Sequence, residues 1–231
     1  MGNSVPIAAT IAIDGPAGAG KTVVGQAVAQ ALGYLFLDTG AMYRALTHLA
    51  LGQGIALTDE EALTGLAERS AIDLRADGPA DGRPYTVLVE AEDVTWQIRR
   101  PEVSNSVSTV SAWPAVRRVL VRRQGQLAAR GCCVLAGRDI GTVVLPQADL
   151  KIFLVASLAE RVHRRAQELR SRGETVDEQE LQAAMAARDQ LDTARAASPL
   201  KPAADAHVVD STGMAVAQVV ATIVALAREK A

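Results

Sequence analysis

Lysine is almost absent from this chain of 231 residues, which contains only Lys21, Lys151, Lys201 and Lys230. Arginine therefore supplies 20 of the 24 basic side chains. A GC-rich genome would explain this bias through its codons, whereas a functional explanation is that planar guanidinium groups match the geometry of phosphate and carboxylate groups. The positions of the arginines along the chain decide between the two explanations.

Net charge is low as well, because 26 acidic residues against 24 basic ones leave a formal charge of −2 at pH 7. A protein that binds nucleic acid through a broad basic surface needs many contacts to phosphate groups. We therefore expect no nucleic-acid partner. The length and the hydrophobic share of 49% are those of a soluble globular enzyme whose core can fold without disulfides.

Cysteines, histidine clusters and long apolar runs are also scarce. Cys132 and Cys133 are adjacent in an apolar stretch, so we expect both to pack in the core without forming a disulfide. His48, His163 and His207 show no metal-ligand spacing. No stretch approaches the roughly 18 apolar residues of a membrane span, and the N-terminus has no targeting pattern. We expect a cytoplasmic monomer with no membrane partner.

Short apolar runs bounded by turn residues alternate with stretches of helical apolar spacing. The runs predict buried parallel strands at Ile7–Ile13, Tyr34–Leu37, Cys132–Ala136, Leu150–Ala156 and His207–Val209. The intervening stretches predict helices at Lys21–Leu32, Gly40–Leu51, Trp113–Arg130, Leu158–Arg170 and Met214–Arg228. This alternation is typical of an α/β fold with a doubly wound sheet.

Two segments interrupt the alternation. Residues 72–100 contain a period-two pattern from Tyr85 to Glu90 after the turn signal Asp77-Gly78-Pro79, which predicts a small antiparallel insert. Residues 157–198 are helical, polar and rich in arginine, with a break at Gly173, which predicts a helical hairpin projecting from the sheet. No linker separates either segment, so we expect residues 1–231 to form one domain.

A phosphate-binding loop follows the first predicted strand. Its residues, Gly15, Pro16, Ala17, Gly18, Ala19, Gly20, Lys21 and Thr22, fit the pattern G-x-x-x-x-G-K-[ST] between a strand and a helix, and all eight are predicted to bind ATP. The glycines let backbone N–H groups face an anion, and the helix N-terminus adds its positive end. Lys21 would reach the β and γ phosphates, and the Thr22 hydroxyl would ligate Mg²⁺ or one of its waters.

Further polar and cationic side chains follow the later strands, at the edge where ligands bind in such sheets. These candidates are Thr39, Arg44, Arg138 and Asp139. Between Val103 and Arg123, Ser108 and Arg117 add a hydroxyl and another cation. Three more candidates, Arg188, Asp192 and Arg195, are spaced i, i+4 and i+7, which places them on one helix face. The arginines thus concentrate at predicted anion sites.

In this combination the residues resemble the bacterial cytidylate kinases, members of the nucleoside monophosphate kinases. The similarity covers nearly the whole chain, through the phosphate loop, Asp38-Thr-Gly-Ala-Met-Tyr-Arg44, the antiparallel insert, Arg117-Arg-x-x-x-Arg-Arg-Gln124, Gly137-Arg-Asp-Ile-Gly-Thr142, Ala159-Glu-Arg-x-x-Arg-Arg165, Arg188-Asp-x-x-Asp192 and Pro202-Ala-Ala-Asp-Ala206. It implies a P-loop NTPase core of five parallel strands flanked by helices. It also implies a monophosphate-binding insert, a mobile helical lid, and transfer of phosphate from ATP to CMP or dCMP with Mg²⁺.

The resemblance assigns roles around the phosphates and the sugar of CMP. By matching motifs, Arg44 and Arg138 would grip the CMP phosphate, and Asp192 would help to hold the sugar hydroxyls. Arg188 and Arg195 would bridge the donor and acceptor phosphates. These assignments follow from the resemblance and not from spacing alone.

By the same matching, the cytosine ring would be surrounded by Thr39, Ser108, Arg117 and Asp139. Cytosine offers an amino donor beside two acceptors, so a carboxylate and a guanidinium form a complementary edge. Uracil has a carbonyl in place of the amine, which would leave two acceptors facing each other and penalise the wrong substrate by a few kcal/mol.

Phosphoryl transfer to CMP needs positioning and charge neutralisation more than a base, because the acceptor phosphate is already an anion. Lys21, Mg²⁺ and arginines of the lid would supply the charge, with Arg188 in the same catalytic set. We expect Arg161 and Arg165 to close on the ATP phosphates, with Arg164 as the alternative because sequence does not fix the helix rotation.

Two positions depart from the family pattern. Thr22 directly follows Lys21, where the family usually has Gly-Lys-Gly-[Ser/Thr], and Ala136 stands where the family commonly has Asp or Glu. We therefore expect either lower activity or another carboxylate, such as that of Asp14, in place of the acidic side chain at position 136. Two alternatives stay open: another small-molecule P-loop kinase such as shikimate kinase, and a non-catalytic nucleotide-binding module.

Overall fold

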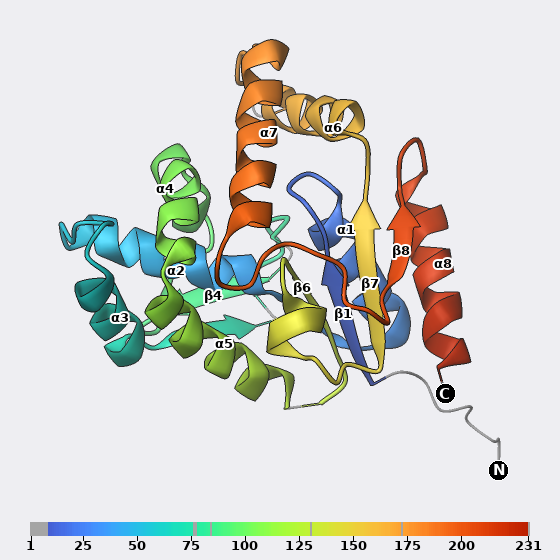
Figure 1. Cartoon of the computed structure of the whole chain (residues 1–231), viewed down its shortest axis with the longest axis horizontal. Helices are drawn as coiled ribbons and strands as arrows, with labels where there is room; N and C mark the ends of the chain where they lie inside the picture. Colours follow the sequence, from blue (N-terminus) through green and yellow to red (C-terminus); the bar gives the residue numbers. More distant parts are fainter. Residues whose placement is uncertain (1–8, 76–77, 84, 130, 172, 231) are drawn as a thin grey trace.

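A five-stranded parallel sheet forms the centre of the molecule (Figure 1). A computed structural model of the chain describes residues 9–75, 78–83, 85–129, 131–171 and 173–230. The strands, in the spatial order β2-β6-β1-β7-β8, are β2 Leu35–Asp38, β6 Cys133–Gly137, β1 Thr10–Asp14, β7 Leu150–Val155 and β8 His207–Asp210. The predicted α/β fold and its five parallel strands are confirmed, although residues 7 and 8 of the first predicted strand lie outside the described residues.

The register of the sheet brings the carboxyl ends of β1, β6 and β2 to one edge. Asp14 at the end of β1 lies opposite Gly137 of β6, and Asp38 at the end of β2 lies opposite Ala136. Ile11 and Ile13 of β1 are completely buried, as expected for a central strand covered on both faces. The sheet thus holds the ends of three strands close together on a rigid base.

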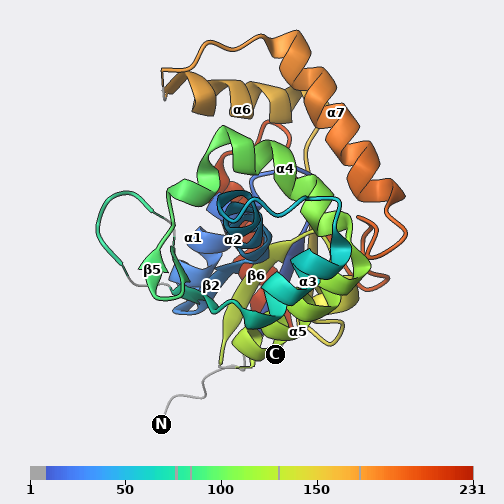
Figure 2. The ribbon, with the colours of Figure 1, turned by 90° about the vertical axis from the view of Figure 1, so that its left-hand side faces the viewer.

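Helices cover both sides of this sheet (Figures 1 and 2). Helices α1 (Lys21–Leu32) and α8 (Val216–Glu229) pack against each other. Helices α2 (Thr39–Gly52), α3 (Glu60–Arg69), α4 (Pro101–Ala112) and α5 (Pro114–Ala128) gather at the β2 end of the sheet. No helix within the described ranges is both long and apolar enough to cross a membrane.

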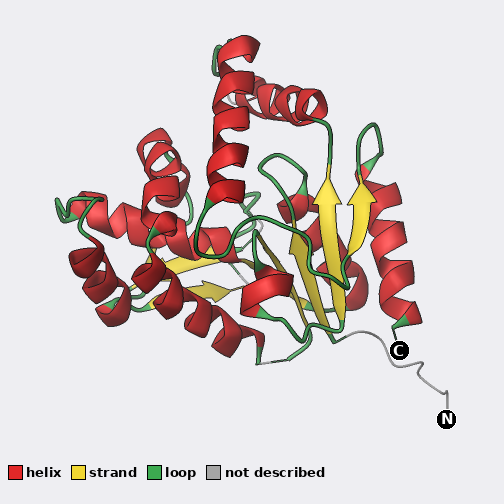
Figure 3. Cartoon of the chain, in the orientation of Figure 1, coloured by secondary structure: helices red, strands yellow, loops and turns green. Residues whose placement is uncertain are grey.

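A second, smaller sheet lies among these helices, as Figure 3 shows. Its strands β3 (Ile72–Arg75), β4 (Thr86–Val89) and β5 (Glu92–Asp93) pair antiparallel in the order β3-β4-β5. Glu90 and Ala91 both have positive φ, 49° and 68°, the combination that a two-residue hairpin turn requires. The predicted antiparallel sheet is confirmed.

Helix α4 is not among the helices predicted from the sequence. It follows the short 3-10 segment η1 (Gln97–Arg99), begins with Pro101, and is rich in serine, threonine and valine, residues with modest helix propensity. Its buried side chains, Val103, Val107 and Val110, recur at i, i+4 and i+7. Burial of this stripe against α2, rather than local propensity, accounts for the helix.

Helices α6 (Leu158–Ser171) and α7 (Glu178–Ala194) form a hairpin, named here the α6–α7 pair, above the carboxyl edge of the main sheet (Figure 1). The chain turns between them at Gly173, whose φ of 81° suits glycine. The Asp177 carboxylate starts α7 by accepting hydrogen bonds from the backbone of Gln179 and Glu180. The predicted helices of this region are therefore present.

The expectation that both cysteines are packed in the core is wrong for Cys132. Strand β6 begins at Cys133, so Cys132 lies at the entry to the strand and is exposed. Cys133 is buried, and burial raises the pKa of its thiol to about 11. Only one of the two thiols therefore behaves as an inert core group.

Candidate active site

The loop from Gly15 to Thr22 joins β1 to α1 at the carboxyl edge of the sheet. A Cβ atom added to Gly15 would lie 2.0 Å from the carbonyl oxygen of Leu154 in β7. Gly20, which precedes α1, has a φ of 91° in the left-handed region. Glycine at these two positions lets the backbone turn tightly and leaves the first N–H groups of α1 available to an anion.

Lys21 lies across this loop. Its Nζ donates a hydrogen bond of 2.7 Å to the carbonyl oxygen of Pro16, and the residue is only 8% exposed. Burial, and then the positive charge of Arg138, hold the pKa of Lys21 well below its ordinary value. An anion bound in the loop would compensate this buried charge.

Thr22 donates a hydrogen bond from its hydroxyl to Oδ2 of Asp38, at 3.0 Å. The same oxygen accepts a hydrogen bond of 3.1 Å from the Tyr85 hydroxyl, while Oδ1 of Asp38 accepts one of 3.0 Å from the backbone N–H of Gly40. Burial raises the pKa of Tyr85 well above its ordinary value, so its hydroxyl stays a donor at neutral pH. The loop, strand β2 and the small sheet therefore meet at Asp38.

Asp14, the expected substitute for a carboxylate at position 136, has both oxygens occupied. They accept hydrogen bonds of 2.7 Å from the backbone N–H groups of Ile140 and Gly141, in the π-helical turn η2 (Ile140–Val144). Burial raises the pKa of Asp14 to about 6. Ala136 is itself buried, and its carbonyl oxygen accepts a hydrogen bond of 2.9 Å from the Thr39 hydroxyl. Asp14 thus anchors a turn of backbone.

Arg117 and Asp139 form a buried ion pair beside this turn. Arg117 also donates to the carbonyl oxygen of Ser111 at 3.0 Å, and its guanidinium carbon lies 5.4 Å from the centre of the Tyr43 ring. Ser108 lies on the same helix as Ser111, one turn earlier, and is half-buried. These residues come from α2, α4, α5 and the end of β6, and meet on one side of the sheet edge.

Helix α7 brings three more predicted residues to the same edge. Arg138 donates from Nε to Oδ2 of Asp192 at 2.8 Å, and Arg195 lies 3.7 Å from Oδ1 of that carboxylate. Burial, and then Arg138, lower the pKa of Arg188 to about 10. Arg44 is the next cation in this group, and burial lowers its pKa too. Positive charges therefore crowd together where they are poorly hydrated.

Arg44 is held in place from α4 and η1. Its Nη1 donates a hydrogen bond of 2.8 Å to the Ser104 hydroxyl and a longer one, 3.5 Å, to the carbonyl oxygen of Ile98. Both partners are neutral, so the Arg44 charge has no carboxylate within hydrogen-bond range among the described residues. The guanidinium is oriented and remains available to an anionic ligand.

The three arginines predicted on α6 differ in their surroundings. Arg161 is buried, donates to the carbonyl oxygen of Ala17 in the loop at 3.1 Å, and lies 2.7 Å from Asp189 of α7. Arg164 pairs with Glu160 and donates to the carbonyl oxygen of Ser211. Arg165 pairs with Glu168 at 2.6 Å on a half-exposed surface, and its charge also acts on Arg44 and Arg188.

Several buried guanidinium nitrogens have no hydrogen-bond partner among the described residues. Across the described part of the chain, buried guanidinium nitrogens that lack a hydrogen-bond partner belong to Arg99, Arg117, Arg188 and Arg195. A buried N–H group without an acceptor is costly, and a bound ligand is one way to supply the acceptor. The arrangement can bind two anionic groups side by side, one in the loop and one among the arginines.

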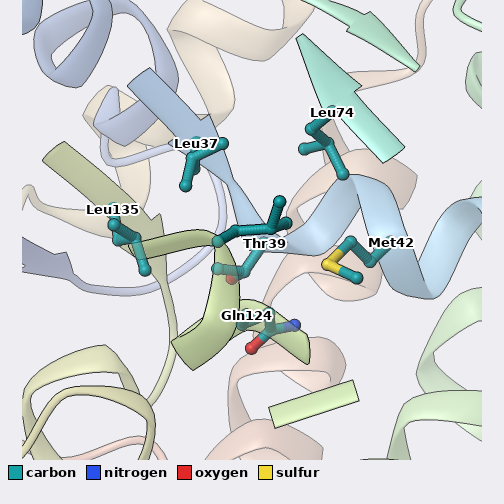
Figure 4. A pocket seen from close by; sticks show the side chains of 7 residues that line it. Leu37, Thr39, Met42, Leu74, Gln124 and Leu135 are labelled. Atoms are coloured by element: carbon teal, nitrogen blue, oxygen red, sulfur yellow. The ribbon is translucent and has the colours of Figure 1, made fainter. Parts of the chain in front are cut away.

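The gap behind Thr39 is a different feature and holds no nucleotide. Figure 4 shows that it is lined mainly by apolar side chains from β2, β6, β3, α2 and α5. Its lining residues are Leu37, Thr39, Met42, Leu74, Gln124, Leu127 and Leu135, and it is too narrow for a water molecule. It is a packing gap of the core beneath the site.

The sequence profile of the cytidylate kinase family matches residues 11–229, which include every residue of the site. The chain belongs to the cytidylate kinase family. A cytidylate kinase of Chloroflexus aggregans is 53% identical over 214 residues, which cover 93% of this chain and 91% of the relative. A cytidylate kinase of Pelotomaculum thermopropionicum is 48% identical over 223 residues, covering 96% of each chain.

Among solved structures, an uncharacterized protein from Eubacterium ventriosum superposes with a TM-score of 0.50. The sequence identity is 11%, and the match covers 94% of this chain and 96% of that one. At this identity the likeness concerns the fold alone. The family assignment rests on the sequence matches.

In this member of the cytidylate kinase family, three residues that sequence reasoning gave no role contact the predicted site residues: Asp38, Tyr85 and Ser104. A carboxylate at the end of β2, directly before a helix, was a usable signal for Asp38. Tyr85 and Ser104 gave none, because their contacts depend on how the small sheet and α4 pack against α2.

Proposed function

We propose that this chain transfers the γ-phosphate of ATP to CMP or dCMP, giving ADP and CDP or dCDP. The observation that carries the proposal is the Arg188 guanidinium, whose buried Nε has no hydrogen-bond partner within the described ranges and whose charge acts on Lys21 of the phosphate-binding loop. Two nucleotides with facing phosphates would supply hydrogen-bond acceptors for such nitrogens. Membership of the cytidylate kinase family favours this reaction over phosphorylation of a hydroxyl acceptor.

ATP would bind through residues 15–22, with backbone N–H groups and Lys21 around its phosphates. Lys21 would exchange its hydrogen bond to Pro16 for phosphate oxygens. The Thr22 hydroxyl is a hard oxygen donor with a carboxylate oxygen 3.0 Å away, so these residues fit Mg²⁺. Bound there, Mg²⁺ would neutralise charge that develops on the β and γ phosphates.

CMP would bind at the arginine-rich part of the edge. Arg44 and Arg138 would hold its phosphate, and Asp192 would hold the sugar. The Arg117–Asp139 pair, with Thr39 and Ser108 beside it, would meet the base. Because Arg117 already binds Asp139, the pair presents a fixed donor and acceptor to the edge of cytosine.

The transfer requires little proton chemistry. An anionic oxygen of the CMP phosphate would attack the γ-phosphorus, and the bond from that phosphorus to the β–γ bridging oxygen would break, leaving ADP with the electron pair. Arg188 and Arg195 would bridge the donor and acceptor phosphates and balance the charge of the transferred group. No general base is needed, because the nucleophile is already ionised.

The α6–α7 pair would act as the lid, and we assign it residues 157–198, with the acceptor-binding insert at residues 72–100 of a single domain. Arg161 supports this role because it joins the loop and α7. When ATP binds, Arg164 would leave Glu160 and Arg165 would leave Glu168. Both guanidinium groups would then bind phosphate groups of ATP. Closure would also exclude water that could hydrolyse ATP.

A coupled assay of ADP release tests the proposal across CMP, dCMP, UMP, AMP and shikimate. We expect turnover with CMP and dCMP, slower turnover with UMP by at least about tenfold, and none with shikimate. Turnover with shikimate alone would point to a hydroxyl-acceptor kinase. ATP binding without any turnover would point to a nucleotide-binding module.

A further inference from the structure

Three hydrogen bonds converge on the Asp38 carboxylate, and its two oxygens have separate tasks. Oδ1 accepts from the backbone N–H of Gly40 and so starts helix α2. Oδ2 accepts from two hydroxyl groups, those of Thr22 and Tyr85. Only the second oxygen connects the phosphate-binding loop with another part of the molecule.

Tyr85 belongs to the small sheet and lies directly before β4. Its side chain is 5% exposed. The ring packs beside Phe36 of β2, with 6.1 Å between ring centres, and the Arg99 guanidinium carbon lies 5.6 Å from the ring centre. The phenol is therefore held rigidly, and its hydroxyl fixes the position of Oδ2 of Asp38.

The hydrogen bond to Asp38 also fixes the Thr22 hydroxyl. A hydroxyl that donates its only hydrogen to a carboxylate keeps both oxygen lone pairs free for a cation. Two carboxylates act on the charge of Lys21, those of Asp38 and Asp14. The Asp14 oxygens are bound to backbone N–H groups, so Asp38 is the carboxylate that faces the loop hydroxyl.

We propose that Asp38 is a positioning residue that orients Thr22 toward the metal of the metal–ATP complex, and that Tyr85 holds Asp38 from the acceptor-binding insert. The Thr22–Asp38 pair then replaces the acidic side chain that Ala136 does not supply. This inference rests on the proposed function, because it assumes that ATP binds with Mg²⁺ in the loop.

Calorimetric titration with ATP, once with Mg²⁺ and once with EDTA, tests the inference without measuring catalysis. Asp38→Asn keeps an oxygen for the Gly40 N–H but removes the charge and an acceptor. Tyr85→Phe leaves the Asp38 carboxylate intact and removes only one hydroxyl. We expect Asp38→Asn to weaken binding of metal–ATP about tenfold and Tyr85→Phe about threefold. Binding of metal-free ATP should stay within about twofold of wild type for both.

Asp59→Asn is the matched control, because Asp59 starts α3 through the Ala62 N–H in the way that Asp38 starts α2. It should leave both affinities unchanged. Equal weakening with and without Mg²⁺, or no weakening in Tyr85→Phe, would overturn the inference. If Asp38→Asn does not fold, the Tyr85→Phe result decides alone. Wild-type protein that binds no ATP would refute the proposed function instead.

Discussion

Arg44 illustrates how a single side chain is prepared for a ligand. Its guanidinium is largely withdrawn from water, which lowers its pKa, and its nearest partners are the neutral Ser104 hydroxyl and the carbonyl oxygen of Ile98. A neutral partner orients a cation without cancelling its charge. Ser104 therefore orients Arg44, which we propose binds the acceptor phosphate.

Ser104→Ala should raise the KM for CMP about fivefold, because one hydrogen bond to Arg44 is lost while its charge remains. The KM for ATP and the kcat should stay within about twofold of wild type. Steady-state kinetics with CMP varied at saturating ATP measures the effect. Ser106→Ala, on the same helix, is the control. An unchanged KM for CMP would show that Ile98 alone positions Arg44.

At the scale of elements, the end of β1 organises the turn that follows β6. Both oxygens of Asp14 are bound to N–H groups of η2, yet burial dominates and raises the pKa to about 6. The unfolded chain has a carboxyl group of ordinary pKa near 3.8. The native state therefore binds more protons than the unfolded state between these two values.

Asp14→Asn tests this linkage. The contribution of Asp14 to stability is greatest below about pH 4 and is lost as the pH rises through about 6, so wild type should lose about 3 kcal/mol relative to the variant over that interval. Urea unfolding of both proteins from about pH 4 to about pH 6.5 measures the difference. Asp210→Asn is the control and should follow wild type over this interval, because hydrogen bonds from Thr212 lower the pKa of Asp210 and its linkage therefore lies below about pH 4. If the free energy of unfolding changes with pH in the same way in Asp14→Asn and in wild type, the expectation is contradicted.

Elements with a strong local pattern were predictable from the sequence, and those defined by tertiary packing were not. Strand β1 is a continuous apolar run, and α1 matches its predicted bounds because glycines at 20 and 33 delimit it. The π-helical turn η2 depends on Asp14, which is 126 positions away in the chain from Ile140. No local signal could indicate such a contact.

The candidate site shows the same division. The loop residues and the arginines could be predicted as candidates because each lies in a short motif. The Tyr85–Asp38 contact could not, because it joins two elements with no shared motif. Arg161, predicted to face ATP, is buried against Asp189 and the carbonyl oxygen of Ala17. Which of the arginines on α6 faces solvent depends on helix rotation, and a sequence does not specify that rotation.

For the whole molecule, the decisive relation is between the α6–α7 pair and the loop (Figure 1). A Cβ atom on Gly18 would lie 2.9 Å from the Met185 side chain and 3.1 Å from Cβ of Arg161. Arg161, with Asp189, joins the loop to both helices. The two helices therefore rest directly on the loop.

Asp189→Ala should release α7 from the loop, because it removes the carboxylate partner of a buried arginine. We expect amide hydrogen exchange in α7 to rise about tenfold while α1 and α8 are unchanged, with faster ATP hydrolysis in the absence of CMP. Hydrogen-exchange mass spectrometry and an ATPase assay measure the two effects. Glu178→Ala breaks the exposed pair with Arg170 in the same hairpin and should change neither. Unchanged exchange in Asp189→Ala would mean that Met185 alone holds the pair down.

The crowding of buried cations at the sheet edge also has a cost for folding. The charges of Arg138 and Arg44 add to the effect of burial in lowering the pKa of Arg188. The ligand-free chain thus gives up part of its folding free energy to keep an anion site ready, a trade-off between stability and function. Nucleotide binding returns that energy. In a cell with abundant ATP and CMP, the substrates would act as structural components that keep the enzyme folded.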